Sequence, residues 1–165
     1  TGESELLKGD KISITDYAYG IKEIIIKEEI KKFIMFGHSM GGYITLSYLN
    51  LFPEDLISIG LIHSSAYQDD NLKVEFRNKA ISFIENNGSL AFVKTSIPGM
   101  FHDTQKHHAE IQELIETAGA IKPESLIQYY KAIQSRPDSC HVLKKAMIPV
   151  LFIAGKKDKI GRAHV

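Results

Sequence analysis

The sequence predicts an α/β fold built on a mostly parallel sheet flanked by helices. Three short apolar runs indicate buried strands, at 33–36, 56–62 and 148–154. One amphipathic helix precedes the first run, and a second helical segment lies between the first run and the next. Because strand, helix and strand in succession are typical of parallel pairing, these elements favour an α/β architecture.

Residues 13–27 carry the first predicted helix. Its apolar residues recur at spacings of three and four, namely Ile14, Tyr17, Ile21, Ile24 and Ile25. Ser13 stands three residues before Asp16, and this spacing predicts a capping box at the start of the helix. The strand at 33–36 follows, and its four consecutive apolar residues predict burial on both faces of the sheet.

A second helix is predicted from Gly41 to Asn50, ending near Pro53. Residues 67–146 then show helical periodicity in three apolar faces: Val74, Ala80, Ile81 and Ile84; Ile111, Leu114, Ile115 and Ala118; and Leu126, Tyr129, Tyr130 and Ile133, the last entered through Pro123. Such a block is too long for a simple crossover, so it predicts a helical cap. Residues 1–66 and 147–165 are then the partial α/β core.

Composition excludes several classes of function. The chain has 20 Lys and Arg against 20 Asp and Glu, and this zero net charge disfavours binding to nucleic acid or to an acidic membrane. No apolar run reaches the roughly 18 residues that a membrane span needs. The single Cys140 cannot form an internal disulfide, and residues 1–10 lack the apolar stretch of a signal peptide. We therefore expect a cytoplasmic protein with a small-molecule partner, and a homodimer is left open.

The run GHSMG at 37–41 fits the pattern G-x-S-x-G, and Gly42 follows it. A buried strand leads into the run and a helix leaves it. A sharp turn at this point lifts the Ser39 hydroxyl above the sheet, and the glycines leave room for the strained backbone. The amino end of the helix points free N–H groups toward a developing oxyanion. The pattern therefore predicts that Ser39 is a nucleophile.

The segment FIMFGHSMGGYITLSYL resembles the nucleophile elbow of the α/β-hydrolase superfamily, and PVLFIAGKKD resembles its acid-bearing strand end. The resemblance implies that Ser39 is the nucleophile and that the Met40 N–H is an oxyanion donor. It also implies Asp158 as the triad acid and His164, in GRAHV, as the base. The implied activity is hydrolysis of a small to medium carboxylic ester, thioester or lactone, with no metal and no organic cofactor.

The chain departs from this family pattern in two places. Asp158 and His164 stand six residues apart, whereas a helix and a strand separate acid from base in the family. Either segments are absent between them or GRAHV is not the histidine loop. The resemblance also places further strands, and the loop with the second oxyanion donor, before Thr1, and Gly2-Glu3-Ser4 resembles the remnant of that loop. We therefore expect only part of the sheet.

Four other residues are candidates for the substrate site. His38 adjoins the nucleophile, where packing beside the turn is the competing interpretation. His63 follows the strand at 56–62, at the edge where open parallel sheets bind ligands. Met100 and Phe101 would line an acyl pocket from the cap, although apolar cap residues also pack on their own core.

Less specific interpretations remain beside these. Ser39 could be a turn serine, and Asp158 and His164 could be solvated surface residues. His102, His107 and His108 do not predict a metal site, because no further ligand stands at a suitable spacing. As a whole, the protein could be a ligand-binding or receptor-like homologue with little or no turnover, or an incomplete and inactive core.

Overall fold

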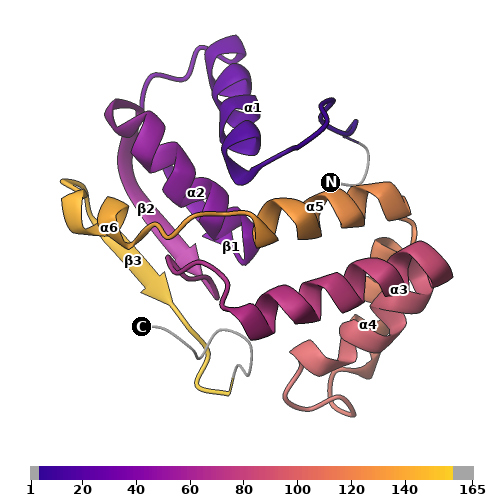
Figure 1. Ribbon diagram of the computed structural model, residues 1–165. Coiled ribbons are helices and arrows are strands. Elements are labelled where there is room, and N and C mark those ends of the chain that lie inside the picture. The colour runs from indigo at the N-terminus through magenta and orange to yellow at the C-terminus, as the bar shows by residue number, and fades with distance from the viewer. Residues whose placement is uncertain (1–3, 158–165) are drawn as a thin grey trace.

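The computed structural model describes residues 4–157 of the chain. Its elements in chain order are α1 (Ile14–Lys27), β1 (Phe33–His38), α2 (Met40–Leu51), the 3-10 turn η1 (Pro53–Asp55), β2 (Leu56–Ile62), α3 (Asn71–Ser96), the 3-10 turn η2 (Pro98–Met100), α4 (His108–Gly119), α5 (Pro123–Gln134), α6 (Cys140–Lys145) and β3 (Val150–Ile153). The strands lie with α1, α2 and α6 at one end of the molecule, and α3 and α4 extend away from them (Figure 1).

The three strands form a parallel sheet in the order β1-β2-β3, which confirms the predicted architecture. The ladder continues one residue past the strands: the Ser39 amide donates to Ile62 O at 3.0 Å, and the His63 amide donates to Ile153 O at 2.9 Å. The carboxyl ends of all three strands therefore meet at one edge of the sheet. In open α/β sheets this is the edge where ligands bind.

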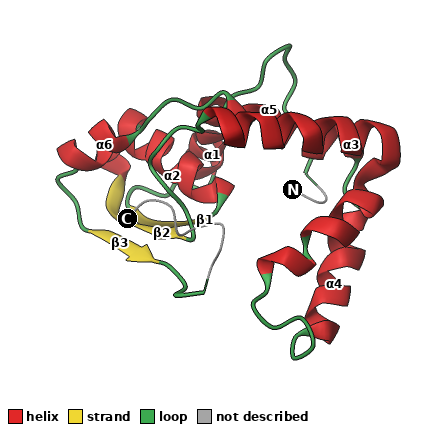
Figure 2. Ribbon diagram, turned by 60° about the horizontal axis from the view of Figure 1, so that its bottom comes forward, coloured by secondary structure: helices red, strands yellow, loops and turns green. Residues whose placement is uncertain are grey.

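One face of the sheet packs against helices α1, α2 and α6 (Figure 2). The buried residues of this core are Ala18, Leu46, Tyr48, Leu49, Leu56, Ile59, Leu61, Ala66 and Val142. On the opposite face, Ile34 and Phe36 of β1 and Leu151 and Ile153 of β3 are 44–55% exposed. The prediction that the first strand is buried on both faces is therefore wrong for residues 4–157, because the described helices cover only one face.

Helices α3, α4 and α5, which we call the helical insertion (residues 71–134), have a core of their own. Its buried residues are Ala80, Ile84, Phe92, Val93, Ile97, Ile111 and Ile115. Helix α3 bends at Gly88, whose φ of 78° suits glycine. Leu114, expected on the apolar face of α4, is 46% exposed instead, because Ile111 and Ile115 form the inward stripe. No helix in the described part of the chain is long and apolar enough to cross a membrane.

The capping box predicted at the start of α1 is present. The Ser13 hydroxyl accepts from the Asp16 amide at 3.4 Å, and an Asp16 carboxylate oxygen accepts from the Ser13 amide at 2.8 Å. The Ser13 hydroxyl also donates to Asp16 Oδ2 at 2.6 Å, and this bond, together with the one from the Ser13 amide, holds the pKa of Asp16 below its ordinary value. The start of α5 at Pro123 also agrees with the sequence, since proline suits the first helical position.

A buried tyrosine joins α2 to the turn before β2. The hydroxyl of the fully buried Tyr48 donates to an Asp55 carboxylate oxygen at 2.7 Å, and Lys22 Nζ of α1 lies 2.6 Å from the same oxygen. Burial raises the pKa of Asp55, but the hydrogen bonds from Lys22 and Tyr48 outweigh it and keep that pKa below its ordinary value. The carboxylate therefore ties α1, α2 and η1 together.

Tyr48→Phe is expected to lower the free energy of unfolding by about 1–2 kcal/mol, because Asp55 loses one of its two donors while the ring keeps its packing. Urea unfolding measures the change. Tyr19→Phe is the matched control, since the Tyr19 side chain is 49% exposed. Equal stability of the two variants would show that the buried hydrogen bond contributes nothing.

Candidate active site

Ser39 occupies the turn between β1 and α2. The strand ends at His38 and the helix begins at Met40, so Ser39 alone makes the turn. Its φ of 52° and ψ of −116° lie in a region that a residue with a Cβ rarely adopts. The side chain is exposed. A strained, exposed serine at the carboxyl edge of a parallel sheet is the geometry expected of a nucleophile elbow.

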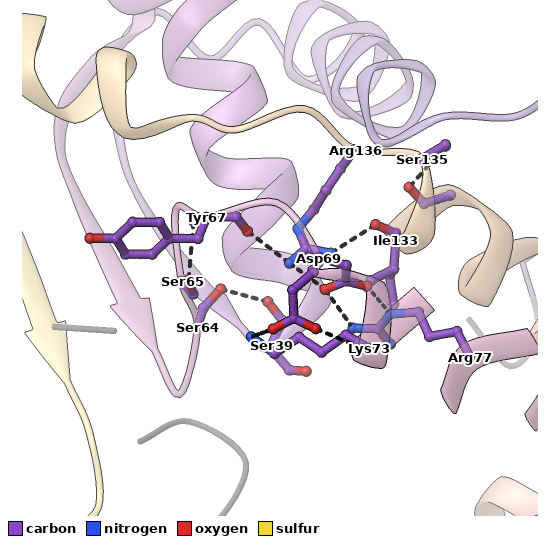
Figure 3. Close-up of polar contacts among 12 residues, drawn as sticks. Ser39, Ser64, Ser65, Tyr67, Asp69, Lys73, Arg77, Ile133, Ser135 and Arg136 are labelled. Carbon is purple, nitrogen blue, oxygen red and sulfur yellow. Dashed lines mark hydrogen bonds and ion pairs between the residues drawn. The ribbon is translucent and has the colours of Figure 1, made fainter. Parts of the chain in front are cut away.

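Three hydrogen bonds hold this strained turn in place. The Ser39 amide donates to Ile62 O at 3.0 Å, which anchors the turn to the neighbouring strand. The Ser39 carbonyl accepts from the Gly42 amide at 3.0 Å and from the Ser64 hydroxyl at 2.8 Å (Figure 3). Bonds to both backbone groups of Ser39 offset the cost of the unusual dihedral angles.

Close approach explains two of the three glycines at 37–42. A Cβ on Gly37 would lie 2.2 Å from Gly41 O, and a Cβ on Gly42 would lie 2.2 Å from Ser64 Oγ. A Cβ on Gly41 would meet nothing within 4 Å apart from its chain neighbours and the backbone of its own helix. The expectation that glycines make room for the turn is therefore confirmed for Gly37 and Gly42, while Gly41 is not required for space here.

Sequence reasoning did not find the role of Ser64 in bracing the turn. The only sequence signal is its position two residues after β2, at the same sheet edge as Ser39. Its hydroxyl bonds the Ser39 carbonyl, and its side chain occupies the space left by Gly42. The contact joins residues 25 positions apart, so it depends on how β1 and β2 pair.

Ser64→Ala is expected to slow covalent capture of Ser39 by a fluorophosphonate by about two- to tenfold, the rate equivalent of one neutral hydrogen bond. The physical reason is the loss of a donor to the strained carbonyl of Ser39. The measurement is the rate of labelling followed by intact mass. Ser65→Ala is the matched control, because the Ser65 hydroxyl accepts from the Tyr67 amide and lies outside the turn. Identical rates in the two variants would contradict the bracing role.

Two histidines flank Ser39. The rings of His38 and His63 have centroids 5.8 Å apart and meet edge to face at 71°. His63 directly follows β2, and its φ of 46° is a second left-handed backbone at this edge. The structure therefore brings together three of the residues singled out from the sequence: His38, Ser39 and His63.

The other predicted residues occupy different positions. The Met40 backbone N–H is the first of α2, where amides have no partner within the helix. Met100, in η2, is 61% exposed, and Phe101 packs against the core of the helical insertion. The structure thus places Met100 and Phe101 on the helical insertion. Asp158 and His164 lie outside the described residues.

A contact between Lys157 and His102 connects the helical insertion to the loop after β3. Lys157 Nζ lies 2.9 Å from His102 Nε2, which is hydrogen-bond distance between the ammonium and the ring nitrogen. His102 follows Phe101, and Lys157 lies in the loop after β3, so this contact links the segment after η2 to that loop. Within residues 4–157, no three His, Cys, Asp or Glu side chains gather as metal ligands would.

A family model described as serine aminopeptidase, S33, matches residues 2–164. The chain belongs to this family. Its membership, together with the parallel sheet and the turn at Ser39, identifies an α/β-hydrolase fold. No curated protein matches the sequence of the chain.

Solved structures share the family's fold. A thermophilic esterase from Thermogutta terrifontis, with malate bound, superposes with a TM-score of 0.88 at 23% identity, over 97% of this chain and 60% of that one. A carboxylesterase structure from Nitrososphaera gargenis superposes with a TM-score of 0.83 at 18% identity, over 97% of this chain and 60% of that one. The enol-lactonase from Burkholderia xenovorans LB400 superposes with a TM-score of 0.84 at 17% identity, over 94% of this chain and 58% of that one. The chain thus spans about three fifths of the length of these structures.

Proposed function

We propose that the protein is a serine hydrolase that cleaves a small to medium carboxylic ester, thioester or lactone through an acyl-enzyme on Ser39. The observation that carries the proposal is the exposed, strained Ser39 at the strand-to-helix turn, held by bonds to both of its backbone groups. Membership in a family of α/β hydrolases supports the same chemistry. The esterases and the enol-lactonase among the similar structures agree with an ester-like substrate.

In the proposed reaction, the Ser39 hydroxyl attacks the carbonyl carbon of the substrate while His164 accepts its proton. The resulting oxyanion accepts a hydrogen bond from the Met40 N–H at the amino end of α2, where the helix dipole favours negative charge. Expulsion of the alcohol or thiol, which takes the proton from His164, leaves the acyl group on Ser39. Asp158 orients His164 and stabilises its charged form.

Water completes the proposed cycle. It attacks the acyl carbon while His164 accepts a proton from it, and collapse of the second tetrahedral intermediate releases the acid and restores the Ser39 hydroxyl. For a lactone the released group is the hydroxyl of the opened ring. Each step is a proton transfer or an acyl transfer, so neither a metal nor an organic cofactor takes part.

Substrate contacts in this proposal come from two sides. His38 and His63 flank Ser39 at the sheet edge, and Met100 and Phe101 would contact the acyl group from the helical insertion, which acts as the cap. The contact between Lys157 and His102 supports this arrangement, because it joins the segment beside Phe101 to the loop that follows β3.

Fluorophosphonate labelling followed by peptide mapping tests the proposal, together with hydrolysis of short and medium p-nitrophenyl esters. Stoichiometric labelling at Ser39 with turnover is the expected result. Labelling without turnover, or a long-lived adduct on Ser39, would instead identify a ligand-binding or receptor-like homologue. Absence of both, in folded protein whose intact mass agrees with its coding sequence, would contradict the proposal.

A further inference from the structure

Both connections of the helical insertion meet at a buried ion cluster. The chain leaves β2 through residues 63–70 and returns to the sheet after α5 through residues 135–139. Asp69 lies in the first connection and Arg136 in the second. Arg136 Nη2 donates to Asp69 Oδ1 at 2.9 Å, and the two side chains are only 6% and 1% exposed (Figure 3). Removal of either partner from such a buried pair is strongly destabilising, because it leaves the other charge buried and uncompensated.

The Arg136 guanidinium contacts three separate segments at once. Nη1 donates to Ile133 O of α5 at 2.8 Å, and Nη2 also donates to Tyr67 O in the first connection at 2.9 Å. The guanidinium carbon lies 3.9 Å from the ring centroid of Tyr43. Tyr43 belongs to α2, the helix that starts directly after Ser39. Arg136 therefore ties the end of the insertion, its entry connection and the helix of the nucleophile to one side chain.

A second arginine completes the cluster from within the insertion. Arg77 of α3 is ion-paired with Asp69, and its guanidinium carbon lies 5.8 Å from the Tyr130 ring of α5. Burial raises the pKa of Asp69, but hydrogen bonds from Arg77 and Arg136 outweigh it and hold that pKa below its ordinary value. The carboxylate is therefore charged at neutral pH and joins α3 to both connections.

The same connection also reaches the nucleophile. Its residue Ser64 donates to Ser39 O, and three residues later Tyr67 O accepts from Arg136. Figure 3 shows this path from Ser39 through residues 64–69 to the two arginines. Arg136 thus contacts both the end of the insertion and the far end of the loop that braces the turn.

We propose that Arg136 is a positioning residue that holds the helical insertion in register with α2 and so sets how substrate is bound over Ser39. The inference rests on the proposed hydrolase function and deepens it. Lysine cannot replace arginine here, because a compact ammonium cannot stack flat on Tyr43 while it donates to three oxygens in different directions. Arg136→Lys keeps the positive charge and removes the clamp, by which we mean the stacking on Tyr43 combined with the hydrogen bonds to Ile133 O, Tyr67 O and Asp69.

Arg136→Lys is expected to raise KM for a p-nitrophenyl ester by about two- to thirtyfold, the range of energetic coupling through one side chain. The kcat per Ser39 titrated with fluorophosphonate is expected to stay within about twofold. A merely structural role would reduce the titrated fraction and leave KM unchanged. Hydrogen exchange of residues 67–87 is expected to speed up while that of β1 does not. Lys79→Met is the matched control, because its pair with Glu75 is exposed.

Two further measurements separate the outcomes. Tyr43→Leu removes the ring under the guanidinium and keeps the ion pair between Arg136 and Asp69, so it tests the clamp if Arg136→Lys does not fold. We expect a smaller rise in KM than for Arg136→Lys, with the same pattern of hydrogen exchange. If the wild-type protein shows no turnover, the proposed function fails, and hydrogen exchange alone decides on the clamp. Wild-type KM and wild-type exchange in both variants would overturn the proposal.

Discussion

Ser39→Ala is expected to abolish covalent capture by a fluorophosphonate and to lower ester hydrolysis by about 10³- to 10⁶-fold, the cost of removing the nucleophile from a serine triad. Alanine retains the Cβ and removes only the oxygen that would carry the acyl group. The fold should be unaffected, because within the described residues the Ser39 hydroxyl makes no capping hydrogen bond to α2. The three bonds that hold the turn use backbone groups of Ser39, and alanine keeps them.

Intact mass after labelling, with peptide mapping, measures the first effect, and p-nitrophenyl ester hydrolysis measures the second. Ser82→Ala is the control, since Ser82 is an exposed serine on α3, away from the turn. Thermal unfolding of both variants should match that of the wild-type protein. Undiminished labelling of Ser39→Ala would remove Ser39 from the mechanism, whatever the strain in its backbone.

Local pattern was sufficient to predict much of the fold. The spacing of Ser13 and Asp16 specifies the start of α1, Pro123 specifies the start of α5, and the apolar runs predict three parallel strands. These features depend on neighbours a few residues apart, which the sequence displays directly. The burial of both sheet faces was predicted wrongly for residues 4–157, because a continuous apolar run indicates a strand without saying which of its faces other elements cover.

In the candidate site too, some residues could be predicted from local sequence and others could not. Ser39 could be found because the turn imposes small residues at fixed spacing around it. Asp69 and Arg136 could not, because charged residues are mostly exposed and neither has a local sign of burial. Asp69 and Arg136 lie 67 residues apart in the chain, and Tyr67 and Arg136 lie 69 residues apart, so these contacts exist only once the insertion has returned to α2.

Gly37→Ala is expected to lower the free energy of unfolding by about 3 kcal/mol or more, at the upper end of what overpacking costs. The new Cβ would lie 2.2 Å from Gly41 O, 2.3 Å from Gly41 C and 2.5 Å from Gly42 N. These are backbone atoms of the first turn of α2, so they cannot move aside as a side chain would. The variant can fold only by displacing α2 from β1, and this displacement also removes the strained geometry of Ser39.

Gly41→Ala is the matched control from the same run of residues. Apart from its chain neighbours and the backbone of its own helix, its Cβ would meet no atom within 4 Å. Gly41 also lies in the first turn of α2, where alanine favours helix by up to about 1 kcal/mol. Urea unfolding should therefore show a large loss for Gly37→Ala and no loss for Gly41→Ala, and only the latter should keep fluorophosphonate capture at Ser39. Equal losses would mean that the two glycines serve the helix in the same way. A loss confined to Gly37 would establish that contact between the strand and the helix backbone forces the turn at Ser39.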